Sequence, residues 1–169
     1  MHEKLPHISL EDHYQFITFR TQDSVDEFLL KIQKDKNLTA KMKQYQIDRY
    51  LDNSKNGAYL YGENIEILKN IILAKDNDIY EVDIFAIMPN HVHILLKQKE
   101  ELSKIMKYIK GKSAVEINKN LNKTGKFWLE SYFDKLIRDQ KHYELVYEYI
   151  ENNPLKAGLN QEERVYSKY

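Results

Sequence analysis

Two histidines separated by one residue, His91 and His93, are the clearest candidates for chemistry in this sequence. Side chains alternate between the two faces of a strand, so both imidazoles are expected on one side and Val92 on the other. Two imidazoles placed in this way can reach a single divalent cation. The His-x-His pattern is short, however, and it fits two surface or hydrogen-bonded histidines equally well.

A second candidate pair, Tyr149 and Asn153, lies near the C-terminal end of the sequence. The two residues are four apart in a helical pattern, which places them on the same helix face. Tyr143 and Tyr147 belong to the same segment. Spacing alone does not decide which tyrosine is reactive, and Asn153 fits equally well as an ordinary residue at the end of a helix.

A third feature is a local excess of lysine. The chain has 26 Lys and Arg residues against 26 Asp and Glu, yet residues 102–128 contain seven lysines and one acid. Three of these lysines recur at intervals of three along one side of a predicted helix. Such a stripe suits phosphate contacts, although it also fits a solvated helix face. The candidate DNA-binding residues are Lys104, Lys107, Lys110 and Lys112.

The elements that must position these residues alternate between strands and helices. A hairpin over 79–97 turns at Pro89-Asn90, and its first strand is expected to place Val82 and Ile84 on one face. The pattern Ser24-x-x-Glu27 predicts a capping box at the start of a helix. The other expected elements are a strand over 13–20, helical structure to about 51, helices over 63–74, 101–121 and 141–153, and a strand within 132–138.

This order of elements predicts an α+β fold in which helices pack on an antiparallel sheet. The length fits a single domain over 1–169, with a core over about 13–159. Pro154 is expected to end the last helix, and the tail after Gly158 is expected to be peripheral.

Composition excludes several classes of protein. The sequence has no cysteine, which rules out disulfide scaffolds, Cys-based zinc sites and thiol nucleophiles. Its longest apolar run is five residues, so no membrane span is predicted. No basic and apolar leader begins the sequence, so we expect a cytoplasmic protein without membrane partners. Balanced charge excludes a strongly basic global field but allows a local basic patch.

Two of these motifs together resemble a known family. MPNHVHILL is similar to the His-hydrophobic-His segment of the HUH single-strand DNA (IS200-like) tyrosine transposases. YIENNPLKAGL resembles their tyrosine helix in the REP-associated subgroup. The segments YQFITFRTQDS and YFDKLIRDQKHYELV and the residue Trp128 also fit this subgroup. The similarity spans about residues 13–159, and the two main motifs in this order are a specific combination.

The resemblance implies a ferredoxin-like central antiparallel sheet of four to five strands flanked by helices. It implies that His91, His93 and Asn153 bind a divalent metal, Mg²⁺ or Mn²⁺, with Asn153 where many relatives carry glutamine. Tyr149 would be the nucleophile that forms a 5′-phosphotyrosine intermediate on single-stranded DNA with hairpin structure. The alternative is a catalytically inactive hairpin-binding protein of the same fold. A monomer and a homodimer that exchanges tyrosine helices both remain open.

Overall fold

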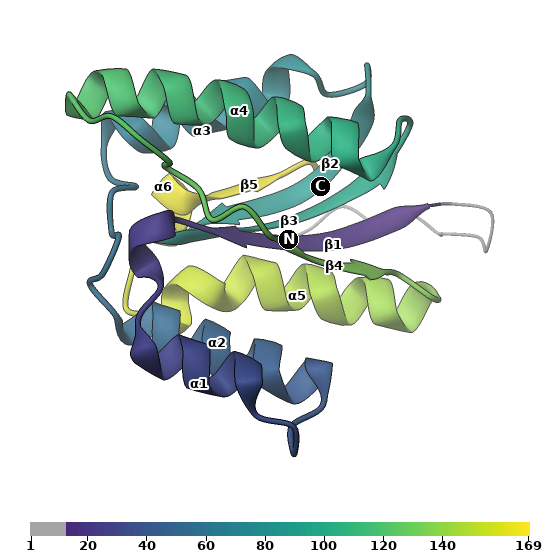
Figure 1. Cartoon of the computed structure of the whole chain (residues 1–169). Coiled ribbons are helices and arrows are strands. Elements are labelled where there is room, and N and C mark those ends of the chain that lie inside the picture. The colour runs from purple at the N-terminus through teal and green to yellow at the C-terminus, as the bar shows by residue number, and fades with distance from the viewer. Residues whose placement is uncertain (1–12) are drawn as a thin grey trace.

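The framework of the protein is an antiparallel sheet of five strands. The computed structural model describes residues 13–169 (Figure 1). The strands lie in the order β4-β1-β3-β2-β5, and every neighbouring pair is antiparallel. Their bounds are Tyr14–Arg20 for β1, Tyr80–Ile87 for β2, His91–Gln98 for β3, Phe133–Leu136 for β4 and Val165–Ser167 for β5.

Helices cover both faces of this sheet (Figure 1). Helices α3 and α4 lie on one face and α5 lies on the other, while α1 and α2 lie beyond α5 on that side. The α+β class and the antiparallel sheet flanked by helices, both predicted from the sequence, are confirmed. The helices are Glu27–Lys34 (α1), Ala40–Asn53 (α2), Glu63–Ala74 (α3), Leu102–Leu121 (α4), Gln140–Lys156 (α5) and Gln161–Arg164 (α6), with a 3-10 turn, η1, at Gln22–Ser24.

Alternation along β3 separates the main core from the functional face. Val92, Ile94 and Leu96 join the cluster that packs against α3 and α4. His91 and His93 therefore point to the opposite face, toward α5. Both histidines are fully buried.

A β-bulge in β2 overturns the expected alternation of its first residues. The register with β3 shifts between Val82 and Ile84. Ile84 consequently packs in the cluster on the α5 side, whereas Val82 and Phe85 belong to the α3 and α4 side. The prediction that Val82 and Ile84 share a face is wrong, because a bulge adds a residue to one strand and reverses the faces after it.

Three local predictions are also corrected. The predicted capping box is wrong: the side chain of Asp26 accepts from the backbone of Leu29, while Ser24 Oγ donates to the Thr21 carbonyl. Pro154 does not end α5 but lies in its last turn, where the helix gives up only the one hydrogen bond that a residue with a backbone N–H would donate there. The tail is not peripheral, because it supplies β5 and pairs with β2.

No helix within residues 13–169 has the length and apolar character needed to cross a bilayer.

Candidate active site

Strands β1 and β3 set the positions of the two histidines. Thr18 pairs with His93 and Arg20 with His91 in the antiparallel register. Thr18 Oγ1 lies 2.8 Å from His93 Nδ1 and fixes that imidazole from behind. Burial lowers the pKa of His93 to about 3 and holds the pKa of His91 well below its usual value. Both rings are therefore neutral, which is the form that binds metals.

Asn90 determines the orientation of the second imidazole. Its amide nitrogen faces the carbonyls of Leu51, Ser54 and Asn56 at 3.1–3.3 Å. The amide oxygen is therefore the atom that faces His91 Nδ1, at 2.7 Å, and His91 Nδ1 must be the donor. This places the proton on Nδ1 and leaves the lone pair of His91 Nε2 available. The turn residue Asn90 thus links the end of α2 to the histidine strand.

We expect Asn90→Ala to lower the free energy of unfolding by about 1–3 kcal/mol, because it leaves buried backbone carbonyls and the His91 N–H without partners. Urea titration followed by circular dichroism measures this loss. Asn152→Ala is the matched control, since its exposed amide bonds only to the Glu148 carbonyl within the same helix. Equal stability of the two variants would contradict the role assigned to Asn90.

Helix α5 brings Tyr149 and Asn153 to the histidines. The Tyr149 ring centroid lies 5.3 Å from that of His93 and 5.9 Å from that of Phe16. The Asn153 side chain, one turn along α5, acts on the Tyr149 hydroxyl and slightly lowers the pKa of that phenol. All four groups come from one chain, and the rings of His91, His93 and Tyr149 lie together with Asn153 one helical turn further on. The roles expected for these four residues stay predictions.

The same helix also shows why Tyr149 differs from its two neighbours. The Tyr143 hydroxyl bonds to Asp83, and the Tyr147 hydroxyl bonds to Ser167. Both of those tyrosines are buried in the cluster between α5 and the sheet. Tyr149 is partly exposed, and its ring lies next to His93. Of the three tyrosines, Tyr149 is therefore the one whose ring lies beside a histidine, which spacing alone did not indicate.

Three buried acceptor atoms at this place have no hydrogen-bond partner within residues 13–169. They are His91 Nε2, His93 Nε2 and Asn153 Oδ1. Buried polar atoms are nearly always satisfied, so a cluster of unsatisfied acceptors indicates a site for a cation. Two imidazole nitrogens and an amide oxygen fit a divalent metal of borderline hardness. In the described chain no three His, Cys, Asp or Glu side chains form a metal-binding group by themselves. The amide of Asn153 belongs to none of those four types.

Helix α2 supplies a carboxylate to the Tyr149 hydroxyl. The Tyr149 hydroxyl donates a hydrogen bond of 2.8 Å to Asp48 Oδ2, and Gln44 donates to Asp48 Oδ1. Burial raises the pKa of Asp48 to about 7, against the lowering effect of these hydrogen bonds. Burial, followed by the charge of Asp48, raises the pKa of Tyr149 far above its usual value. The phenol therefore keeps its proton until a base removes it, and Asp48 is placed to do so.

A second carboxylate follows one helical turn later. Asp52 Oδ1 lies 3.5 Å from His91 Nε2, and Asp52 is about one-fifth exposed while the imidazole is fully buried. Burial raises the pKa of Asp52 to about 6, with the charge of Lys156 opposing this shift. Asp52 Oδ1 is another buried acceptor without a hydrogen-bond partner in the described part of the chain.

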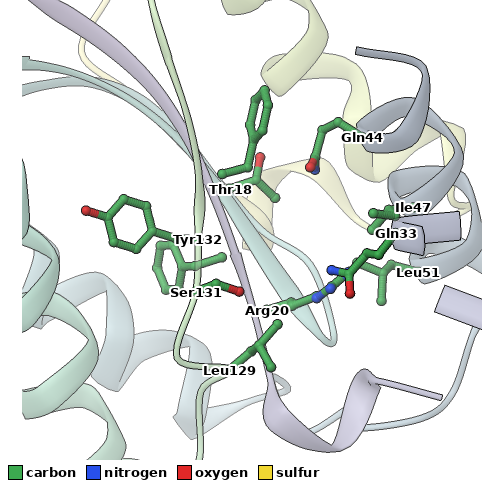
Figure 2. A pocket seen from close by; sticks show the side chains of 11 residues that line it. Thr18, Arg20, Gln33, Gln44, Ile47, Leu51, Leu129, Ser131 and Tyr132 are labelled. Atoms are coloured by element: carbon green, nitrogen blue, oxygen red, sulfur yellow. The ribbon is translucent and has the colours of Figure 1, made fainter. Parts of the chain in front are cut away.

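Two hollows adjoin this site. A groove of about 710 Å³ runs between α2, β4 and α5, and both Tyr149 and Asp48 line it. A smaller cavity of about 180 Å³ lies on the other side of Gln44 (Figure 2). In Figure 2, Arg20 extends from β1 toward Gln33 and Leu51 within this cavity. The groove is lined by four cationic side chains, Lys41, Lys135, Arg138 and Lys141, and by three acidic ones, Asp48, Asp134 and Asp139.

The predicted lysine stripe lies elsewhere. It belongs to α4, on the face of the sheet opposite α5 (Figure 1). Lys104 pairs with Glu100, and Lys110 donates to the carbonyls of Leu129 and Glu130. The ammonium of Lys110 thus holds the segment before β4. DNA binding by Lys104, Lys107, Lys110 and Lys112 stays a prediction.

A sequence model of the IS200-like transposases matches residues 56–153, which is more than half of the chain. The chain belongs to this transposase family. The match includes His91, His93, Tyr149 and Asn153, and it begins after α2. A protein of Haemophilus influenzae with no assigned function is 28% identical to this chain in an alignment that covers 44% of it. That alignment spans about half of the relative, 54% of its length.

Two solved structures share the transposase fold. A REP-associated tyrosine transposase bound to a REP hairpin has a TM-score of 0.53 and 17% identity, covering 95% of this chain and 76% of the other. A protein described as a transposase from Deinococcus radiodurans R1 has a TM-score of 0.50 and 17% identity, covering 90% and 98%. At 17% identity, the similarity to these two structures shows a shared fold and nothing more.

Sequence reasoning missed the α2 carboxylates, Arg20 and the role of Asn90. One signal was available for the carboxylates. Asp48 and Asp52 are four apart on a helix, where like charges repel, and each follows a core residue, Ile47 or Leu51. A repelling pair beside an apolar helix face is costly unless a positive group balances it.

Proposed function

We propose that this transposase cleaves and rejoins single-stranded DNA, with Tyr149 as the nucleophile and hairpin-containing strands as substrates. The observation that carries this proposal is the position of the Tyr149 hydroxyl, between Asp48 and the unpartnered acceptors of His91, His93 and Asn153. A reactive phenol beside a base and a cation site is suited to phosphoryl transfer.

The cleavage step follows from these contacts. Tyr149 Oη attacks the phosphorus of a phosphodiester, and its proton passes to Asp48. The bond between phosphorus and the 3′ oxygen breaks, and that oxygen takes up a proton to give a free 3′-hydroxyl. The product is a 5′-phosphotyrosine on the downstream strand. Because the phosphoester bond is conserved, attack by a 3′-hydroxyl on this link rejoins a strand without ATP.

We further propose that His91, His93 and Asn153 hold the divalent cation, Mg²⁺ or Mn²⁺. When bound, the cation stabilises negative charge on the phosphate oxygens. The protein fixes the three ligands in advance through Thr18 behind His93 and Asn90 behind His91. Asn153 also lies one helical turn from Tyr149 on α5, so a single helix would carry both a ligand and the nucleophile.

The cleaved strand is proposed to lie in the groove between α2, β4 and α5, because only that groove leads to Tyr149 among the hollows described above. The four cationic side chains of this groove can neutralise phosphates, while the charge of Arg20, in the smaller cavity, acts on Asp48. The neutral net charge of the chain makes this local distribution important.

We expect the double variant Lys135→Ala with Arg138→Ala to weaken the binding of a short unstructured strand at least tenfold. The reason is the loss of two phosphate contacts, which also reduces the magnitude of the slope of log affinity against log salt by about 1.4 for a single strand. Fluorescence anisotropy over a salt series measures both. The comparison variant is Lys104→Ala with Lys107→Ala, on the opposite face of the sheet. If this second variant lost more affinity for the short strand than the first, the groove assignment would be wrong.

The test of the proposed function is a labelled-strand assay with Mn²⁺ or Mg²⁺. The substrates are a pool of single strands, each with a hairpin flanked by randomised segments. A 3′ label should move into a protein band on a denaturing gel, while a 5′ label should give a shorter strand with a free 3′-hydroxyl. Hairpin binding without any adduct would instead support the non-catalytic binding protein. A 5′ label in the protein band would overturn the predicted polarity.

A further inference from the structure

The α2 residue Asp52 has no part in the cleavage scheme above, yet it faces the cation site. Asp52 Oδ1 is buried and has no hydrogen-bond partner in the described chain. It lies 3.5 Å from His91 Nε2, which is also buried and without a hydrogen-bond partner there. Two further atoms of this kind are His93 Nε2, on a ring whose centroid lies 4.8 Å from that of His91, and Asn153 Oδ1, one helical turn from Tyr149.

Both members of the Asp52–His91 contact are acceptors. His91 donates through Nδ1 to Asn90, so its Nε2 carries a lone pair. A carboxylate oxygen also has only lone pairs to offer. Two acceptors that face each other in a buried place repel unless a positive charge lies between them. The separation of 3.5 Å is longer than a good hydrogen bond, so a proton shared by the two atoms would remove little of this repulsion.

We propose that Asp52 becomes a fourth protein ligand of the divalent cation held by His91, His93 and Asn153. In the described chain His91, His93 and Asp52 do not yet form a metal-binding trio, so the proposal requires the Asp52 carboxylate to turn toward the cation when it binds. The inference rests on the proposed function, since it assumes that this cation is present. A carboxylate adds a negative charge and a hard oxygen to two imidazoles and one amide. The resulting donor set favours Mn²⁺ and Mg²⁺ more strongly than the three neutral ligands do.

The position of Asp52 in the chain fits this role. It lies in the last turn of α2, before the segment that matches the family model. The same turn is tied to the histidine strand by the bond from Asn90 to the Leu51 carbonyl. Asp52 is the most exposed of the four groups, so it closes the cation site on its solvent side.

The experiment is a calorimetric titration of the full chain with MnCl₂ at neutral pH, in the absence of DNA. The variants are Asp52→Asn, Asp48→Asn and His91→Ala. Asp48→Asn is the matched control, because it removes the same charge from the same helix one turn away and leaves the four ligands in place. Thermal melts of each metal-free variant report whether it folds.

We expect Asp52→Asn to raise the Kd for Mn²⁺ at least tenfold and Asp48→Asn to change it less than threefold. Without metal, Asp52→Asn should melt no lower than the wild type, because its new amide can donate to His91 Nε2. A change of less than tenfold for Asp52→Asn, or an equal loss for both Asp variants, would overturn the ligand assignment. If the wild type binds Mn²⁺ no better than His91→Ala, the metal site of the proposed function fails, and this inference fails with it.

Discussion

Tyr149→Phe is expected to abolish the covalent protein–DNA adduct. The rate of adduct formation should fall at least about 10³-fold, to below detection. The variant removes one oxygen atom, which is the proposed nucleophile, and keeps the ring beside His93 and Phe16. Binding of hairpin strands should persist, because the cationic groove is unchanged. The measurement is the denaturing-gel adduct assay, run beside an anisotropy titration of the same strand.

The matched control is Tyr147→Phe, the same change two positions earlier in α5. The Tyr147 hydroxyl bonds to Ser167 at the edge of the sheet and does not face the histidines. We expect this variant to form the adduct at a rate within a few-fold of the wild type. An adduct of undiminished yield in Tyr149→Phe would show that another residue is the nucleophile.

Much of this site was predictable because strand and helix periodicity fix which side chains share a face. The spacing of His91 and His93 and that of Tyr149 and Asn153 each placed two groups together. Their convergence was not predictable from spacing. It depends on α5 packing on the face of β3 that carries the histidines, and only the resemblance to tyrosine transposases indicated it.

The misses have physical causes of the same kind. The bulge in β2 and the pairing of β5 depend on tertiary contacts that no local pattern encodes. Asp48 and Asp52 act on the site only because α1 and α2 lie beyond α5 on the functional face (Figure 1). The lysine excess is real, but α4 holds it on the other face of the sheet. Local charge therefore predicted a cationic surface without placing it relative to Tyr149.

Asp48→Asn is expected to reduce the rate of adduct formation about 10²- to 10⁴-fold, the usual contribution of a general base. The change nearly preserves shape. The new amide can still accept from Tyr149, and Gln44 can turn its own amide to accept the new N–H. What is lost is the ability to take up the phenol proton. Single-turnover kinetics on one labelled strand measure the effect.

The pH profile separates this role from a structural one. Burial raises the pKa of Asp48 to about 7, and the charge of Asp52 adds to the shift. The Tyr149 and Gln44 hydrogen bonds and the Arg20 charge oppose it. The base must be ionised, so the wild-type rate should rise with pH and level off near or below pH 7, since a bound cation favours the carboxylate. The variant should lack this inflection. An inflection kept at the same pH would assign it to another group.

The pH dependence of the folding stability tests the ionisation of Asp48 independently. The pKa of Asp48 is higher in the folded chain than the usual value of 3.8, so the folded state holds the proton more tightly than the unfolded state. This contribution is fully present below about pH 4 and is lost as the pH rises to 7, by roughly 1 kcal/mol for each pH unit. Metal-free Asp48→Asn lacks the titrating group, so its stability relative to the wild type should increase over that interval. A buried base that weakens the fold at neutral pH is what a site selected for proton transfer requires, and a stability difference independent of pH would contradict it.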